Sequence, residues 1–206
     1  MSAEFKSNSL HKGLIEFIEG CELPTEMANF YIYAFKENLT NKEHLAITLG
    51  KFIINRPVLS RIHSQCLTGE SLFSLRCDCR FQLTESLKKI AKNGTGVVFY
   101  LQQEGRNIGL LNKIRAYKLQ DSGLDTVEAN LDLGFEDDPR DYKIVTAMAK
   151  YLGINSINLM TNNPHKIKAL KENGLTVNKR IPIKSKANKY NKNYLKTKAK
   201  KLGHLL

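Results

Sequence analysis

Apolar and polar residues alternate in three short segments of the N-terminal half, and this period of two is typical of β-strands with one buried face. The segments cover residues 30–35, 44–49 and 57–62, and we expect them to be antiparallel strands. Residues 8–20 instead place apolar side chains at helical spacing and end at Gly20, which predicts a helix. The chain is therefore expected to open with a helix and to continue into a sheet.

Helical periodicities and short apolar runs alternate from residue 83 onward, an order that is typical of a parallel sheet covered by helices. The apolar runs at 97–101 and 157–160 predict buried strands, and Pro182 predicts that strand 176–183 lies at a sheet edge or ends there. The predicted helices cover residues 83–94, 110–120, 139–153 and 164–173. We therefore expect an α/β fold, a layered α/β/α arrangement with a mixed sheet whose antiparallel strands lie in the N-terminal part.

Length and composition are those of an ordinary globular protein, with 206 residues, 42% of them hydrophobic and 25% charged. We expect one domain over residues 22–206, preceded by a helical extension, 1–21. No apolar run approaches the ~20 residues that span a bilayer, and charged side chains interrupt the N-terminal region, unlike in a signal peptide. We accordingly expect a cytoplasmic protein with reduced cysteines and no membrane partner.

The net charge of +12 indicates an anionic partner such as a nucleotide, a nucleic acid or a membrane surface. Much of the excess lies in residues 184–206, which contain eight lysines and no acidic residue. A tail of this kind is usually solvated or mobile, and we expect the same here. The functional alternative is that the tail attracts phosphate groups to a nearby pocket.

Three of the four cysteines form a cluster, Cys66-x10-Cys77-x-Cys79, and thiolates are strong zinc ligands. Structural zinc sites usually have four protein ligands, whereas catalytic sites have three and keep one position open for water. The cluster supplies three, so we predict an open zinc site that makes hydroxide near neutral pH, with a bound-water pKa of roughly 7. The alternative is that these cysteines are small buried hydrophobes, and we expect the isolated Cys21 to be a buried or half-buried thiol.

Two loops that follow predicted strands are suited to phosphate. Residues 102–109 form a polar, glycine-containing loop before a helix, and Thr161 and Lys166 flank the start of another helix that Asn163 caps. Helix N-termini bind anions, and the ligands of open α/β sheets collect where strands end. Together with the zinc site, these loops predict a metal-assisted hydrolase of a phosphorylated compound.

The region between the two loops contains turn-forming residues and the start of a helix. Residues 125–130 and 134–138 are expected to be loops, and Asp138 and Pro139 predict the N-cap and the first residue of a helix. A cap alone accounts for Asp138. Arg140 gains nothing at a helix N-terminus, where the helix dipole disfavours cations, so we regard it as a candidate functional residue.

Several long motifs resemble the GTP cyclohydrolase II family, in collinear order across residues 22–206. The motifs are Arg61–Gly69, Ser74–Cys79, Phe81–Gln82, Gln103–Tyr117, Asp125–Asn130, Thr161–Pro164 and Gly203–Leu206. The resemblance implies a cytoplasmic, homodimeric enzyme that commits GTP to riboflavin synthesis. It implies opening of the imidazole ring of guanine, release of formate and pyrophosphate, and a diaminopyrimidinone ribosyl 5′-phosphate as product, with Mg²⁺ neutralising the triphosphate.

The resemblance also implies roles for individual residues. The cysteine cluster binds one Zn²⁺ per subunit, Asp138 accepts a proton, Tyr117 takes part in ring opening, and Arg140 is proposed to attack the α-phosphate. Nucleotide contacts fall on Arg61, Ile62, His63, Ser64, Gln65, Gln82, Glu104, Gly105, Arg106, Thr126, Thr161 and Lys166. Because a guanidinium stays protonated and is a poor nucleophile, we expect Arg140 to be a bidentate phosphate clamp instead.

Three positions depart from the family pattern. Gln65 stands where the family usually has glutamate, Gln102 where it commonly has arginine, and Arg80 where it has glycine. These differences leave open a paralogue with another substrate or product. A second alternative, a basic nucleic-acid-binding protein with a structural zinc, gives no role to the 104–106 loop or to Tyr117, and we do not expect a nucleic-acid partner.

Overall fold

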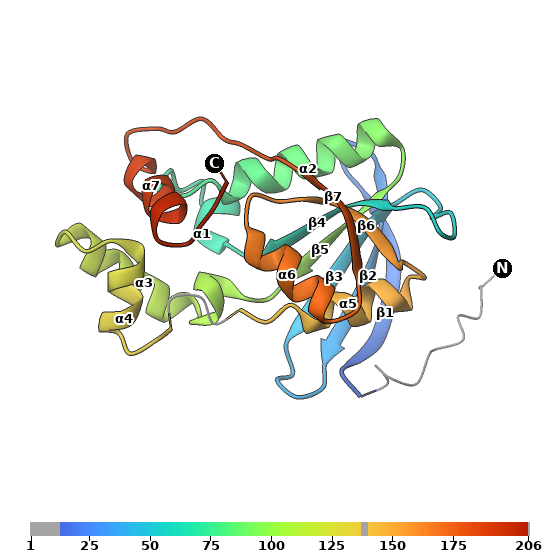
Figure 1. The fold of residues 1–206 in the computed structure, drawn as a ribbon, viewed down its shortest axis with the longest axis horizontal. Coiled ribbons are helices and arrows are strands. Elements are labelled where there is room, and N and C mark those ends of the chain that lie inside the picture. Colours follow the sequence, from blue (N-terminus) through green and yellow to red (C-terminus); the bar gives the residue numbers. More distant parts are fainter. Residues whose placement is uncertain (1–12, 137–139, 206) are drawn as a thin grey trace.

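A seven-stranded mixed sheet forms the centre of the computed structural model, which describes residues 13–136 and 140–205 (Figure 1). The strands are β1 (Ile15–Pro24), β2 (Asn29–Glu37), β3 (Glu43–Leu49), β4 (Val58–Ser64), β5 (Gly96–Leu101), β6 (Ser156–Met160) and β7 (Thr176–Ile181). Their order is β1-β2-β3-β5-β4-β6-β7, with antiparallel pairs from β1 to β5 and parallel pairs from β5 to β7. The predicted α/β class with a mixed sheet is confirmed.

Strand β4 departs from the prediction in its direction. It was expected to be antiparallel, but it runs parallel to both of its neighbours, β5 and β6. Its side chains are buried or half-buried on both faces, as is usual for the central strand of a parallel sheet. The alternating pattern of residues 57–62 therefore predicted a strand correctly but carried no information about its partners.

Helices cover both faces of the sheet and gather beyond one of its ends (Figure 1). They are α1 (Leu67–Glu70), α2 (Cys79–Asn93), the 3₁₀ helix η1 (Glu104–Asn107), α3 (Leu110–Asp121), α4 (Thr126–Asp132), α5 (Lys143–Tyr151), α6 (Pro164–Glu172) and α7 (Lys192–Lys200). On one face Ile90 of α2 belongs to the same buried cluster as Val98 of β5, and on the other Val145 of α5 shares a cluster with Phe99. Adjacent residues of β5 thus pack into separate hydrophobic cores on the two faces of the sheet. None of the helices described is long and apolar enough to cross a bilayer.

The helix expected at residues 8–20 is wrong for the part that the structure describes. Residues 15–24 form β1, which pairs with β2, whereas residues 1–12 lie outside the described part of the chain. The expected domain boundary therefore falls inside a strand. The Phe17 ring stacks on that of Tyr151 with 5.1 Å between centroids. A short apolar segment fits both the helical and the strand period, and pairing with β2 decides between them.

The segment before β6 holds one helix more than the sequence predicts. The loop expected at residues 125–130 is instead the start of α4. A capping box closes this start, because the Asp125 side chain accepts from the amide of Glu128 and the Glu128 side chain accepts from the amide of Asp125. The turn-forming character of Asp125 is thus the signature of a helix N-cap.

Helix α5 starts later than predicted. It begins at Lys143, not at residue 139, and Asp138 and Pro139 lie outside the described residues. The carbonyl of Asp141 accepts a hydrogen bond from Gln103 Nε2 at 2.7 Å, so this backbone group is bonded to the loop that follows β5. The non-helical conformation of Arg140 leaves its side chain at the cavity described below.

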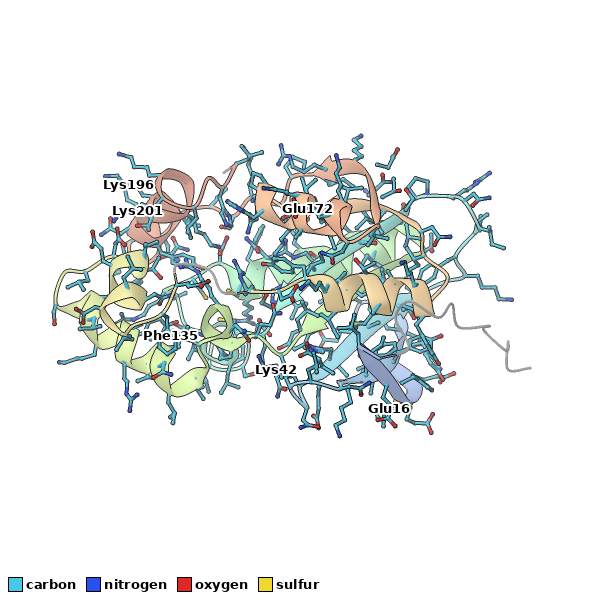
Figure 2. The ribbon with its side chains drawn as sticks, turned by 60° about the horizontal axis from the view of Figure 1, so that its bottom comes forward. Glu16, Lys42, Phe135, Glu172, Lys196 and Lys201 are labelled. Carbon is cyan, nitrogen blue, oxygen red and sulfur yellow. The ribbon has the colours of Figure 1, made fainter. Side chains whose placement is uncertain are left out.

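The lysine-rich C-terminal segment is packed onto the fold, contrary to the mobile tail that we expected. Leu195 of α7 and Leu202 after it are buried. Lys201 forms ion pairs with Asp125 at 2.5 Å and with Glu128 at 2.8 Å, which join α7 to the start of α4. Figure 2 shows Lys196 of α7 and Lys201, which directly follows α7, above the helices at this end of the molecule.

Candidate active site

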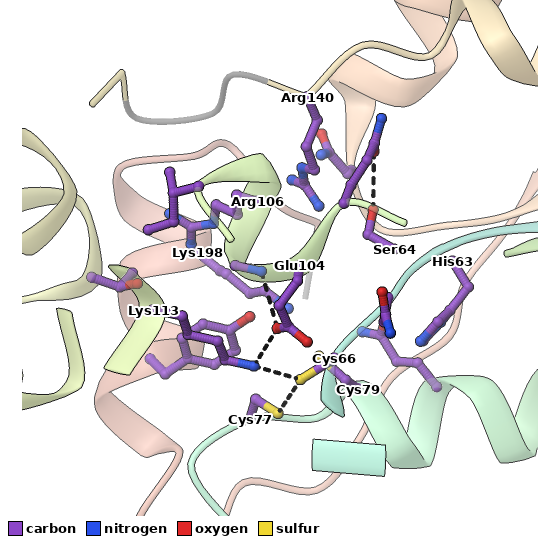
Figure 3. Close-up of a pocket in the computed structure, with 18 of the residues that line it drawn as sticks. His63, Ser64, Cys66, Cys77, Cys79, Glu104, Arg106, Lys113, Arg140 and Lys198 are labelled. Atoms are coloured by element: carbon purple, nitrogen blue, oxygen red, sulfur yellow. Dashed lines mark hydrogen bonds and ion pairs between the residues drawn. The ribbon is translucent and has the colours of Figure 1, made fainter. Parts of the chain in front are cut away.

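A cavity lies where β4, β5 and β6 end, at the carboxyl edge of the parallel part of the sheet. Gln65 and Cys66 follow β4, Gln103 follows β5 and Thr161 follows β6, and all four line this cavity. Figure 3 shows the three cysteines at one side of it and Arg106 and Arg140 across from them. This edge is where open α/β sheets bind their ligands.

The cysteine cluster occupies one corner of the cavity. Cys66 follows β4, Cys77 precedes α2 and Cys79 is the first residue of α2. The three sulfur atoms lie within 4.8 Å of one another, and the Sγ atoms of Cys66 and Cys77 are 3.6 Å apart. Among the described residues, no other group of three histidine, cysteine or acidic side chains could hold a metal ion. Within residues 13–136 and 140–205, the cluster thus offers three potential ligand atoms to a metal ion, and zinc binding at this cluster stays a prediction.

The backbone beside the cluster is shaped to leave room for it. Gly69 of α1 lies so close that a Cβ atom there would be 2.7 Å from Cys77 Sγ and 3.0 Å from Cys66 Sγ. Contacts this short between a Cβ and a sulfur atom do not occur without a shift of one of them. Glycine is therefore the residue that allows the three sulfurs to converge at this point.

The three thiols differ in acidity because they share one negative charge. Hydrogen bonds from Cys77 and Cys79, together with the ammonium of Lys113, lower the pKa of the Cys66 thiol far below its ordinary value, although burial opposes this. The hydrogen bond with Cys66 raises the pKa of Cys77 to about 11, and hydrogen bonds with both partners raise that of Cys79. A divalent cation stabilises all three as thiolates, so this donor set fits Zn²⁺.

Lys113 connects the cysteine corner to the loop that follows β5. Its Nζ donates to Cys66 Sγ at 3.2 Å and to Glu104 Oε1 at 2.7 Å (Figure 3). The other carboxylate oxygen of Glu104 accepts from the Leu67 amide at 2.6 Å. Burial lowers the pKa of Lys113, but the Cys66 thiolate and Glu104 raise it by more. The net pKa therefore lies above its ordinary value, and this residue stays charged.

Cationic side chains form much of the remaining wall. They are Arg61, Arg76, Arg106, Arg140, Lys166 and Lys198, whereas Glu104 is the one carboxylate among the described lining residues. Arg61 donates to the carbonyl of Met160 at 2.9 Å and to the side chain of Gln82, and burial lowers its pKa to about 10. Lys166 Nζ donates to the carbonyl of Ile62 at 2.9 Å. The cavity therefore attracts an anion.

His63 is held in one orientation at the cavity wall. Its Nε2 lies 2.8 Å from Glu70 Oε1, and the hydroxyl of Tyr100 donates to the other oxygen of Glu70 at 2.6 Å. Burial lowers the pKa of His63, so the ring is neutral, and Nε2 carries the proton because a carboxylate only accepts. The buried Nδ1 has no hydrogen-bond partner among the described residues, and in this tautomer it is a hydrogen-bond acceptor.

Comparisons with known proteins identify the family. Residues 16–182 match the family model described as GTP cyclohydrolase II. The chain is 56% identical to the GTP cyclohydrolase-2 of Azotobacter vinelandii, over 93% of this chain and 92% of that protein. It is 54% identical to the GTP cyclohydrolase-2 of Pseudomonas paraeruginosa and 53% identical to that of Shewanella sediminis, each over 93% of this chain and 94% of the relative. The chain belongs to the GTP cyclohydrolase II family.

Membership of the GTP cyclohydrolase II family makes this protein an enzyme of the hydrolase class, and it confirms the resemblance on which the residue assignments rest. Among solved structures, the chain is similar to a two-domain 3,4-dihydroxy-2-butanone 4-phosphate synthase from A. baumannii. That similarity has a TM-score of 0.48 and 16% identity, and it covers 85% of this chain and 41% of that protein's length.

Nearly every residue that the family resemblance implicates lies at the cavity. Those that line it are Cys66, Cys77, Cys79, Arg61, His63, Ser64, Gln65, Gln82, Glu104, Gly105, Arg106, Tyr117, Thr126, Arg140, Thr161 and Lys166. The side chain of Ile62 is instead fully buried in the core, because alternate residues of β4 face opposite sides of the sheet. Only its carbonyl reaches the site, through Lys166. Asp138 lies outside the described residues.

The three departures from the GTP cyclohydrolase II pattern are not equally close to the site. Gln65 lines the cavity. Gln102 is exposed, and its side-chain oxygen accepts from the amide of Glu43 at 3.0 Å. The guanidinium of Arg80 lies over the ring of Phe73, with 4.1 Å to its centroid, and neither residue lines the cavity. Of the three, only Gln65 is placed to alter contacts with a ligand.

Several lining residues were missed by the sequence reasoning. Lys113 lies one helical turn before Tyr117, so the spacing of the motif already placed both on one face of a helix. Tyr194, Lys198 and His204 line the cavity from the C-terminal segment. The closing motif Gly203–Leu206 includes only His204. For Tyr194 and Lys198 the sole signal was the alternative that the lysine-rich tail attracts phosphate to a nearby pocket, whereas such a tail is usually solvated.

Replacing Gly69 with alanine is expected to weaken zinc binding by at least tenfold. The added Cβ would lie 2.7 Å from Cys77 Sγ, and moving one sulfur by a few tenths of an ångström disturbs a site whose ligand distances vary little. Competition with a chelator of known zinc affinity would measure the effect. Gly13→Ala is the matched control, since a Cβ at Gly13 meets nothing within 4 Å. Equal zinc affinity in both variants would contradict the prediction.

Proposed function

We propose that this protein hydrolyses GTP, opens the imidazole ring of guanine and releases formate and pyrophosphate, as the first step of riboflavin synthesis. The product on this proposal is a diaminopyrimidinone ribosyl 5′-phosphate. One observation carries the proposal: three thiols, with no fourth metal ligand among the residues that the structure describes, share a cavity with the cationic wall. Family membership indicates that GTP is the substrate that would contact both.

Cys66, Cys77 and Cys79 would hold the zinc ion. When bound, Zn²⁺ supplies Lewis-acid chemistry, which activates water near neutral pH for attack on the C8 atom of guanine. Lys113 would keep Cys66 in place through its hydrogen bond to Sγ, and it would balance part of the negative charge of the three thiolates. Mg²⁺ would accompany the triphosphate and neutralise part of its charge.

The cationic wall would bind the triphosphate. Arg106 and Arg140 lie across the cavity from the cysteines, so phosphates held there leave the base near the metal (Figure 3). Arg140 acts in this proposal as a bidentate clamp, because a guanidinium remains protonated. His63 would accept a hydrogen bond from an N–H group of guanine through its unpaired Nδ1.

Tyr117 would act at the ring-opening step from α3. Its hydroxyl lies 3.2 Å from Thr68 Oγ1, and its ring lies next to the ammonium of Lys113 at 5.7 Å from Nζ to the centroid. Burial raises the pKa of Tyr117, so its phenol stays protonated at neutral pH and can donate a proton. Asp138 is assigned as the proton acceptor by family resemblance alone. A homodimer and a cytoplasmic location are proposed on the same basis.

The test is an assay of the purified protein with GTP, Mg²⁺ and Zn²⁺ in which formate and pyrophosphate are measured separately. We expect both to be released in equal amounts. Release of pyrophosphate without formate, or of neither, would contradict the proposal. The same assay with Gln65→Glu tests the one departure that lines the cavity: a large gain in GTP turnover would indicate that the native residue serves another purine nucleotide.

Changing Arg140 to lysine is expected to lower kcat/KM for GTP about tenfold, and changing it to alanine about a hundredfold. Lysine keeps the charge but loses the planar fork that binds two phosphate oxygens, whereas alanine loses both. Arg115→Lys, at an exposed position on α3, is the control and should leave kcat/KM unchanged. A clamp would be excluded if the lysine and alanine variants lost activity to the same extent.

A further inference from the structure

The C-terminal segment contributes to the cavity although it lies beyond the region that the family model covers. The match ends at residue 182, yet Tyr194, Lys198 and His204 all line the cavity. Figure 1 shows α7 and the C-terminus beside α1 and the start of α2, the elements that carry the cysteine cluster. The segment is therefore placed to act on the same ligand as the rest of the site.

Lys198 holds α7 against the metal corner. Its Nζ lies 2.9 Å from Asp78 Oδ1, and both side chains are at most one-tenth exposed. The other oxygen of Asp78, which stands between Cys77 and Cys79, accepts from Gln82 Nε2 at 2.6 Å. Lys198 also lies over the ring of Tyr194, with 4.6 Å from Nζ to the centroid. A buried pair of this kind holds its two elements together in one geometry, because breaking it leaves an uncompensated charge.

The residues after α7 are fixed to the loop that follows β6, which also lines the cavity. The amide of Leu205 donates to the carbonyl of Asn162 at 2.8 Å, and the amide of His204 donates to the carbonyl of Lys198 at 3.0 Å. Asn162 stands directly after Thr161 and before the N-cap of α6. The chain from Lys198 to Leu205 thus runs from Asp78, between two of the cysteines, to the loop after β6 that the sequence predicts to bind phosphate.

His204 faces the cationic part of the cavity with a neutral ring. No hydrogen bond of its ring nitrogens is found among the described residues. Lys198, Arg140, Lys166 and Arg106 line the same cavity, and their positive charges act on the ring. Burial and these four cations lower the pKa of His204 to about 3. A neutral imidazole keeps one N–H donor, which suits a phosphate oxygen in a place where a further cation would be repelled.

We propose that residues 191–205 close the substrate cavity, with His204 as a residue that donates a hydrogen bond to the phosphate chain and Lys198 as a positioning residue that anchors the segment on Asp78. The ligand class is a polyphosphate, and its identity as part of GTP rests on the proposed function. Neither residue is assigned a part in the chemistry at the guanine ring, so the segment affects substrate binding more than turnover.

Binding of inorganic tripolyphosphate to the purified zinc-loaded protein tests His204. Calorimetry should show that His204→Ala weakens binding about tenfold, the usual effect of one hydrogen bond to a charged group, whereas binding of guanosine stays the same. In the GTP assay the same variant should raise KM and change kcat by less than twofold. Lys196→Ala, at an exposed position of α7, is the control. Unchanged tripolyphosphate binding in His204→Ala would overturn the role of His204.

Trypsin cleavage at the exposed lysines of the segment tests the closure. Tripolyphosphate should slow cleavage in the native protein and in Lys198→Arg, which keeps the charge for Asp78, but not in Lys198→Gln. A cleavage rate that the ligand leaves unchanged in the native protein would overturn the closure. Tripolyphosphate contains no guanine, so these two experiments test the closure independently of the proposed function. The proposed function fails only if GTP yields no formate.

Discussion

Replacing Cys66 with serine is expected to abolish zinc binding and to reduce GTP hydrolysis by about 10³-fold or more. The hydroxyl of serine is a far weaker zinc ligand than a thiolate, and a site with three ligands has none to spare. Metal-assisted activation of water contributes several kcal/mol to a transition state, and each 1.36 kcal/mol corresponds to a factor of ten in rate. Zinc content per subunit, measured by elemental analysis, and formate release from GTP are the two readouts.

Cys21 provides the matched control for this experiment. It was expected to be a buried or half-buried thiol, but it lies exposed on β1, away from the cavity. Cys21→Ser should therefore retain both the metal and the activity. Full activity of Cys66→Ser without bound zinc would remove the metal from the mechanism. Retention of one zinc ion by Cys66→Ser would mean that a group outside the described residues completes the site.

Changing Asp78 to asparagine is expected to lower the free energy of unfolding by about 3 kcal/mol or more. The substitution leaves the ammonium of Lys198 buried without a counter-charge, and loss of one partner from a buried pair typically costs this much. Asparagine has nearly the same volume as aspartate, so the loss of stability reflects the missing charge and not a cavity. Urea unfolding, with the slope of the transition checked for a change in two-state behaviour, is the measurement.

Asp121→Asn is the control for the Asp78 experiment. Asp121 pairs with Arg76 at a similarly short distance, 2.7 Å against 2.9 Å for Asp78 and Lys198, but both side chains are at least 40% exposed. Exposed pairs contribute roughly 0–1 kcal/mol because water screens them. If the two substitutions lowered the free energy of unfolding equally, the buried Asp78–Lys198 pair would contribute no more to stability than an exposed pair. Helix α7 would then be held mainly by its apolar contacts.

Local patterns determined a large part of this protein. The continuous apolar run of β5 reflects residues that face cores on both sides of the sheet, and Gly94 after α2 adopts the left-handed conformation expected of a helix C-cap. The start of α6, with Asn163 as N-cap and Pro164 behind it, was also predictable. These features depend on neighbours within about one helical turn, so the sequence contains them in full.

The cysteine spacing also predicted which three side chains could bind a metal ion together. Cys77 and Cys79 lie at the start of one helix and Cys66 follows a strand, and the structure brings their sulfur atoms within 4.8 Å of one another. What the spacing could not supply was the surroundings. The Lys113 ammonium reaches Cys66 across 47 positions of sequence, and Gly69 leaves the room that the sulfurs need only because the chain folds back there.

Tertiary structure decided the elements whose local signal was ambiguous or misleading. Residues 15–20 fit two periods, and pairing with β2 made them a strand. Strand β4 runs parallel to β5 because the connection between them is a crossover that contains α2. The lysine-rich C-terminal segment became part of the cavity wall because Asp78, 120 positions earlier, neutralises Lys198 inside the protein. Strand pairing and charge neutralisation join residues that are distant in sequence, and no local period records them.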